Sequence, residues 1–291
     1  MSTPQPQTQQ QMQQQAAPNW QAAPGPSYTS PIPITRTHLG HAIASEWTKI
    51  KSVRSTIWTL GAFVLLVIGL GLLFAIIAAS ADMNLEGESP LGLGLFGVML
   101  GSVCIITLGV LTTASEYGTG MIRTTMTACP SRGRVLAAKA IVFFVLAFTV
   151  TLVATALVAF LQVAILGDSN AADPTSEEWI KATVGVSLFL ALFGLLALLM
   201  GSLIRHSAGG ITIMLGLFLA PLVIAIFMFA QALKDVQEFL LNYSIPSQLG
   251  VFYSAELGSS GPSGWDPLWI MLGLTAAAFA GAFLLLEKRD V

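Results

Sequence analysis

The 291-residue sequence is poor in charged side chains. Only 10% of its residues are Asp, Glu, Lys or Arg, against about 25% in soluble domains. Hydrophobic residues make up 54%, and the mean hydropathy is +0.76. Two cysteines and three scattered histidines form neither a disulfide framework nor a set of metal ligands. Basic residues occur only in short segments, which excludes a nucleic-acid partner. This composition is typical of a membrane protein.

Motifs for catalysis and nucleotide binding are also missing. The sequence contains no GxxxxGK[ST] phosphate loop, no HExxH and no GxSxG. Because the chemistry of ATP hydrolysis or metal-assisted hydrolysis requires such groups, we expect this chain to be no enzyme by itself. We also expect it to hold no cofactor and no metal of its own.

Six apolar runs are each long enough to cross a bilayer, which takes about 20 residues. They cover residues 57–79, 91–113, 140–166, 182–204, 208–230 and 267–286. None contains an Asp, Glu, Lys, Arg or His. The runs predict an all-α integral membrane protein with six transmembrane helices. Ion-coupled carriers keep ionisable groups at depth, so the charge-free spans count against a carrier.

The charges between the runs predict the orientation. Of the thirteen basic residues, all but Lys181 and Lys234 fall on the side of the N-terminus if six spans are assumed. Most acidic residues fall in the alternate connections. The positive-inside rule then places both termini in the cytoplasm. Tryptophans mark the predicted span ends, as interfacial aromatic rings do: these are Trp58, Trp179, Trp265 and Trp269.

Two segments precede the first span. Residues 1–35 are rich in Gln and Pro and lack apolar residues to pack, so they predict a disordered cytoplasmic tail. Residues 36–291 then form one six-span domain. Within it, Ile43, Trp47 and Ile50 lie on one helical face before the first span, and Lys49 is expected to point away. This pattern favours an interfacial helix that bends into the membrane; the alternative is a plain extension of the first span.

The connection between the fifth and sixth runs is too apolar for a solvated loop. Pro246 separates two short helical stretches, neither long enough to cross. We expect a re-entrant or interfacial pair of helices there. Small residues also recur four apart, which favours close helix packing: Gly97 and Gly101, Gly216 and Ala220, and Gly273, Ala277 and Gly281.

Between the second and third runs lies a compact basic insert. Its residues 119–129 predict about three helical turns, ended by Pro130. We expect Glu116 to pair with a basic residue of the preceding interfacial helix or of the insert. Arg123 is expected to be exposed to the carboxylate of a partner. The alternative, a loop that only orients the chain, is equally compatible with the residues.

Two stretches resemble the membrane subunit, or permease, of bacterial type-2 ATP-binding-cassette (ABC) exporters. "SEWTKIKSVRSTIWTL" (45–60) is similar to the elbow helix of that family, through Glu46, Trp47, Lys49 and Arg54. "SEYGTGMIRTTMTACPSRGRVLAAK" (115–139) is similar to its coupling-helix motif. The matching positions are Glu116, Tyr117, Gly120, Pro130, Arg132 and Lys139. Gly118 and Met121 depart from the pattern, and the turn at Pro246 resembles the outer re-entrant break.

The resemblance implies a permease in the bacterial cytoplasmic membrane that exports an amphipathic or hydrophobic substrate. ATP and magnesium would bind to a separate cytoplasmic ABC ATPase, which docks on the coupling helix. A second permease copy or a paralogue would complete the transporter. Two alternatives stay open: an ion-coupled carrier or channel without an ATPase, and a membrane anchor or scaffold that recruits partners through its tail.

Overall fold

The structure is a computed structural model that describes residues 38–81, 83, 85, 87–167, 171–255 and 261–288. By its internal contacts the chain divides into residues 1–36 and 37–291, and the fold belongs to the second unit. The predicted disordered tail, residues 1–35, lies outside the described residues.

All regular elements of the described residues are helices. In chain order they are α1 (Leu39–Ser52), α2 (Arg54–Ser80), the 3₁₀ helix η1 (Pro90–Leu93), α3 (Gly94–Gly118), α4 (Met121–Ala128), α5 (Arg132–Leu166), α6 (Ser176–Ile180), the π-helix η2 (Lys181–Gly185), α7 (Val186–Ile204), α8 (Ser207–Ile226), η3 (Gln231–Leu233), α9 (Lys234–Tyr243), α10 (Ile245–Val251) and α11 (Asp266–Lys288).

Six of these helical stretches are long and apolar enough to span a membrane, which confirms the predicted all-α six-span fold. They are α2, η1 with α3, α5, α6 to α7, α8 and α11. The third is longer than predicted: α5 begins at Arg132 rather than near Ala140. Ser131 is the last extended residue after Pro130, and nothing in "RGRVLAAK" stops a helix, so the helix continues out of the apolar run.

The bundle is organised around α7, whose spanning stretch is 72% buried, against 17% for α11. Glycines allow α7 to approach α3 closely. A Cβ on Gly109 of α3 would lie 2.4 Å from the Gly194 carbonyl oxygen of α7, so a larger residue would not fit there. Gly97 and Gly101 likewise bring α3 against Val67 and Phe63 of α2, as their spacing predicts. By contrast, Gly216, Gly273 and Gly281 have no atom within 4 Å of an added Cβ. The expected close packing at those three positions is therefore not made among the residues that the structure describes.

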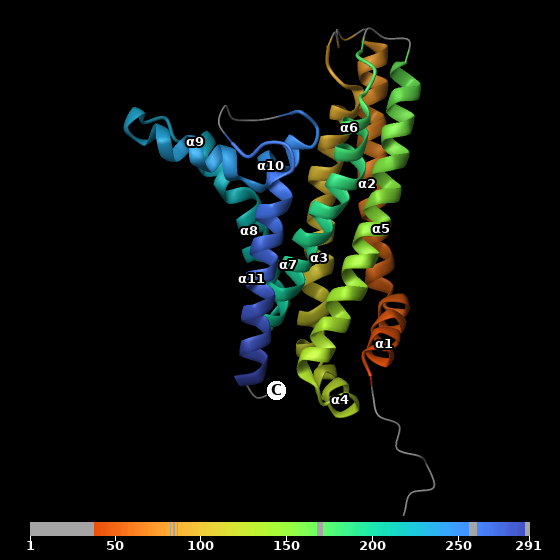
Figure 1. Ribbon diagram of the computed structural model, residues 1–291, viewed down its shortest axis with the longest axis vertical. Coiled ribbons are helices and arrows are strands. Elements are labelled where there is room, and N and C mark those ends of the chain that lie inside the picture. Colours follow the sequence, from red (N-terminus) through yellow and green to blue (C-terminus); the bar gives the residue numbers. More distant parts are fainter. Residues whose placement is uncertain are drawn as a thin grey trace, which may run out of the picture. The chain divides into compact units, whose positions relative to one another are not determined.

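The helix before the first span is separate from it. Val53 is extended (φ −84°, ψ 113°) and interrupts the helix between α1 and α2. Helix α1 lies beside the lower end of α5 (Figure 1). Glu46 is the buried residue of α1, Lys49 turns inward with it, and Trp47 is 41% exposed. Lys49 thus points away from Trp47, as helical spacing predicts. It points toward the bundle, where its ammonium contacts carboxylates.

The connection before α11 contains the two predicted short helices. They meet at Ser244, whose hydroxyl accepts a hydrogen bond from the Ser247 N–H. Pro246 is the second residue of α10, where a missing N–H costs nothing. The two helices differ in burial: all seven residues of α10 are buried, whereas α9 exposes Phe239 and Tyr243. Figure 1 shows α9 extending sideways from the bundle.

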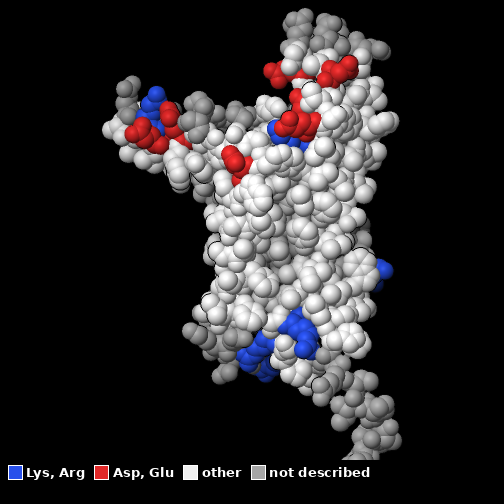
Figure 2. All heavy atoms as spheres, in the orientation of Figure 1, with Lys and Arg blue, Asp and Glu red and all other residues white. Residues whose placement is uncertain are grey.

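On the face seen in Figure 2, charged side chains lie mainly toward the two ends of the bundle, and most of the surface between them is uncharged. The start of α1, the end of α11 and all of α4 lie at one end (Figure 1). Basic residues dominate this end, and acidic residues dominate the opposite one (Figure 2). Trp58 and Trp269, at span ends, are 78% and 69% exposed, as interfacial rings are.

Candidate functional site

Four charged side chains meet between α1, α3 and α5. The Lys139 ammonium lies 2.7 Å from Glu46 Oε2 and 2.6 Å from Glu116 Oε1. The Lys49 ammonium lies 2.7 Å from Glu46 Oε1 and 3.1 Å from Glu116 Oε1. It also donates to Thr125 Oγ1 of α4 at 3.1 Å. We call Glu46, Lys49, Glu116 and Lys139 the ion cluster; its formal charge is zero, and it joins four helices.

The ion cluster is shielded from solvent. The side chains of Glu46, Glu116 and Lys139 are each 4% exposed, and that of Lys49 is 25% exposed. Charges this buried are retained only when each has partners, since removing one leaves an uncompensated charge. Burial acts to lower the pKa of Lys49, but hydrogen bonds and charge from Glu46 and Glu116 outweigh it, so the pKa is raised. The stabilisation from Lys49 is therefore complete at neutral pH and is lost as the pH rises through that elevated pKa.

The short helix α4 is set off from α3 by a sharp turn. Gly120 is the residue before α4 and has φ +73°, a left-handed conformation that favours glycine. The helix has eight residues, so about two turns form rather than the three predicted. Ile122 is buried against the bundle, and Thr125 and Met126 are half-buried on the same face. Arg123 and Thr127 are exposed on the opposite face.

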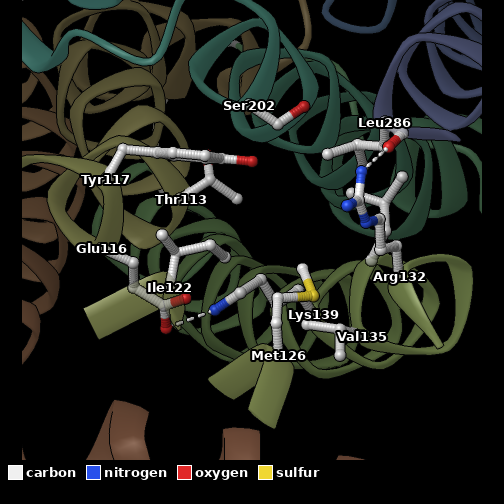
Figure 3. A pocket seen from close by; sticks show the side chains of 11 residues that line it. Thr113, Glu116, Tyr117, Ile122, Met126, Arg132, Val135, Lys139, Ser202 and Leu286 are labelled. Carbon is white, nitrogen blue, oxygen red and sulfur yellow. Dashed lines mark hydrogen bonds and ion pairs between the residues drawn. The ribbon is translucent and has the colours of Figure 1, made fainter. Parts of the chain in front are cut away.

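Other residues of the coupling-helix motif tie the ends of α3 and α5, on either side of α4 in the chain, to further spans (Figure 3). Arg132, at the start of α5, donates a 2.7 Å hydrogen bond to the Leu286 carbonyl oxygen in α11. The Tyr117 ring, in the last turn of α3, stacks under the Arg205 guanidinium at 4.9 Å. Arg205 ends α7 in a left-handed conformation. Figure 3 shows Glu116, Tyr117, Arg132 and Lys139 converging on one hollow from α3 and α5.

The structure brings together some of the residues singled out from the sequence. Glu46, Lys49, Glu116 and Lys139 form the ion cluster, and the expected pairing of Glu116 with a basic residue of α1 is present. Tyr117 and Arg132 contact neighbouring helices, and Gly120 forms the turn before α4.

The other residues lie apart from the ion cluster. Arg123 is exposed on α4, and Pro130 is exposed after it. Trp47, with the Lys51 ammonium 5.2 Å from its ring, is exposed on α1, and Arg54 is exposed at the start of α2. Pro246 belongs to α10.

Three participants were not picked out from the sequence. Thr125 accepts from Lys49, Arg205 stacks on Tyr117, and Leu286 supplies only its backbone carbonyl. Arg205 had a signal, because it is the lone basic residue between the fourth and fifth apolar runs. A threonine in a Thr-rich helix and a backbone carbonyl carry no such signal.

Comparison with known proteins assigns the chain to a family. No curated protein matches the chain. The family model described as "ABC-2 family transporter protein" matches residues 5–291, which is nearly the whole chain and includes the ion cluster, α4 and all six spans. Members of this family are transmembrane subunits that work with an ABC ATPase and are not enzymes themselves. The chain therefore belongs to the ABC-2 transporter family, as a multi-pass permease subunit of an ABC transporter.

Proposed function

We propose that this permease exports an amphipathic or hydrophobic substrate across the bacterial cytoplasmic membrane, driven by a separate ABC ATPase that docks on α4. ATP and magnesium bind to that ATPase. A second permease copy or a paralogue completes the pathway. The end of the bundle that carries α4 faces the cytoplasm, because basic residues dominate it and the positive-inside rule applies.

The proposal rests on the position of α4, which exposes one face at the end of the bundle and is hydrogen-bonded through the other to the buried ion cluster. One face of α4 is open at the end of the bundle, with Arg123 and Thr127 exposed on it. The opposite face is fastened through Thr125 and Lys49 to the ion cluster. A push on α4 is therefore transmitted to α1, α3 and α5 together, which is what a coupling helix must do.

The nature of the substrate is inferred from the spans. In the described residues, the charged side chains of the spanning helices lie toward the helix ends, Lys139 in the third turn of α5 being the deepest along its helix, and the central stretches are apolar. An apolar pathway suits a substrate that is itself apolar or amphipathic, because a strongly charged one would pay a large desolvation cost.

The exposed Arg123 provides the test. Arg123→Glu reverses the charge offered to the ATPase without touching the ion cluster. We expect the tagged wild-type permease, purified in mild detergent from its native membranes, to carry a stoichiometric subunit with a GxxxxGK[ST] loop. The variant should lose about tenfold or more of it, as expected when attraction at an interface turns to like-charge repulsion.

Lys234→Glu is the matched control, because Lys234 is 71% exposed at the opposite end of the bundle. It should copurify the ATPase as the wild type does. If Arg123→Glu retains the ATPase fully, or if no ATPase accompanies the wild type even after crosslinking, the docking assignment is wrong. Only the absence of an ATPase from the wild type would make the ion-coupled carrier the better description.

A further inference from the structure

A cavity of about 560 Å³ lies under the bend between α1 and α2. The end of α1, the first two turns of α2 and the last turns of α3 enclose it. Its apolar lining comes from Ile50, Val53, Leu108, Leu111 and Met121. Its hydroxyl lining comes from Ser55, Thr56, Thr59, Thr112, Ser115 and Thr119. All four residues of the ion cluster, whose charges sum to zero, form part of its wall.

The hydroxyl groups form two stripes that face each other. Thr112, Ser115 and Thr119 are spaced i, i+3 and i+7, which places them on one face of α3. Thr56 and Thr59 are spaced i and i+3 on α2. In otherwise apolar spanning helices, two polar stripes turned toward one cavity indicate a polar occupant.

The protons of these hydroxyls are already used. Thr59, Thr112, Ser115 and Thr119 each donate a hydrogen bond to a carbonyl oxygen one turn back in their own helix. Each oxygen keeps lone pairs that face outward, because a hydroxyl accepts as well as donates. The walls formed by these four residues therefore offer acceptors rather than donors.

The ion cluster adds to the excess of acceptors. Lys49 has three ammonium protons, and its three bonds go to Glu46, Glu116 and Thr125. Glu116 Oε2 is buried and makes no hydrogen bond within the described residues. Because that oxygen is buried, a ligand in the cavity does not contact it, and the donor–acceptor balance of the wall is set by the hydroxyl groups and by Lys49. The wall thus offers acceptors and few free donors, which matches a ligand that is rich in N–H donors.

We propose that this cavity binds a primary ammonium group carried on an apolar body. The ammonium supplies three donors to the hydroxyl stripes, and the apolar lining takes the carbon atoms next to it. The cavity lies where α2 begins, beside the lipid-facing Ile57 and Trp58, which are 61% and 78% exposed. Such a ligand has two sources: an ethanolamine phospholipid of the surrounding leaflet, or a transported amphipathic amine. Only the second source rests on the proposed export function.

Phospholipids that differ only in their headgroup test the need for N–H donors. The purified full-length permease is offered phosphatidylethanolamine, phosphatidylcholine and phosphatidylglycerol with identical acyl chains, and retained lipid is counted by native mass spectrometry. Phosphatidylcholine keeps the positive charge but replaces all three N–H groups by methyl groups. We expect the ethanolamine lipid to be retained about tenfold more than the choline lipid, and the anionic lipid least. Equal retention of the ethanolamine and choline lipids would overturn the proposal.

Variants test whether the preference for the ethanolamine lipid over the choline lipid depends on the cavity. Thr112→Val, Ser115→Ala and Thr119→Val together remove the α3 stripe and leave the ion cluster in place. The preference for ethanolamine over choline should then disappear. Thr107→Val is the matched control, because Thr107 makes the same backbone bond, to the Val103 carbonyl, outside the lining of the cavity. A preference unchanged in the triple variant, or lost equally in the control, would place the selectivity elsewhere.

Dodecylammonium and dodecyltrimethylammonium distinguish the two sources. Dodecylammonium should displace the bound ethanolamine lipid, and its trimethylated analogue should not; displacement by both or by neither contradicts the proposal. With the complete complex, displacement that also stimulates ATP hydrolysis assigns the cavity to a transported amine. Displacement without stimulation assigns it to the lipid. Lipid retention needs no ATPase, so failure of the proposed export function would not affect that measurement.

Discussion

The two ends of the bundle use charge differently. At the end that carries α4, Glu46, Lys49, Glu116 and Lys139 come from three helices and are buried together. At the opposite end, the described ion pairs join Lys181 to Glu177 and Lys234 to Glu238. Each of those pairs is spaced i, i+4 along one stretch of chain, and both acids are exposed.

The difference shows what each arrangement can do. An exposed pair within one helix contributes little to stability, because water and salt screen it. It also leaves the helix free to move. A buried network across α1, α3 and α5 fixes the three helices relative to one another, because separating them leaves charges unpaired in a medium of low dielectric. The α4 end is therefore built to move as one unit.

The opposite end is stabilised by neutral groups instead. Helix α10 is buried along its whole length, and its first turn is capped by a serine hydroxyl. Phe252, just after it, packs against Phe189 of α7 with ring centroids 5.7 Å apart. The contacts here are short-range and apolar, so no buried charge is left unpaired if they are lost. This contrast leads to three predictions.

The largest effect is expected from Lys139→Met. The variant buries two carboxylates with one ammonium, and loss of a buried charge partner costs about 3–5 kcal/mol. The apparent melting temperature of the detergent-solubilised protein should fall sharply. Adding Glu116→Gln restores the formal neutrality of the cluster and should recover part of the loss. A single variant as stable as the wild type would mean that the four charges do not hold α1, α3 and α5 together.

A smaller effect is expected from Ser244→Ala at the other end. The substitution removes the hydroxyl that accepts from the Ser247 N–H, and loss of such a cap costs about 1 kcal/mol. Faster amide hydrogen exchange in α10 would report it. Ser247→Ala is the control, because Ser247 Oγ is buried without a hydrogen-bond partner in the described residues. Equal losses in both variants would show that burial, and not the cap, is what the serine provides.

The smallest effect is expected from Lys234→Gln. Lys234 is 71% exposed and lies 3.6 Å from Glu238, so the pair contributes less than about 1 kcal/mol. The melting temperature should stay within experimental error of the wild type, both at low salt and in 0.5 M salt (roughly a 4 Å screening length). A loss comparable to that of Lys139→Met would remove the contrast between the two ends.

Much of the fold followed from the sequence because a bilayer constrains it so strongly. Runs of apolar residues must form helices in lipid, so six spans could be counted directly. The two short helices around Pro246 were also predicted from residue order. Helix ends were less predictable: α5 begins at Arg132 because helix propensity, not hydropathy, decides where a helix leaves the membrane.

The ion cluster was predicted only in part. Glu116 was expected to find a basic partner in the preceding helix, and Lys49 is one of its two partners. Helical spacing placed Lys49 on a different face of α1 from Trp47, but it did not indicate that this face turns toward the bundle. A helical face can be read from one segment, but the partner that it meets depends on where α3 and α5 place their charges.

The sequence by itself determined the number of spans, the separation of basic from acidic ends and the break before α4 at Gly120. Each of these follows from local chemistry: transfer of side chains into lipid, attraction of cations to one side, and the left-handed conformation that glycine permits. The tertiary structure alone decided that Glu46, Lys49, Glu116 and Lys139 neutralise one another, and that two hydroxyl stripes meet around one cavity. Those features join residues as many as 93 positions apart, as Lys139 and Glu46 are. Only packing of the helices brings such residues within hydrogen-bond distance.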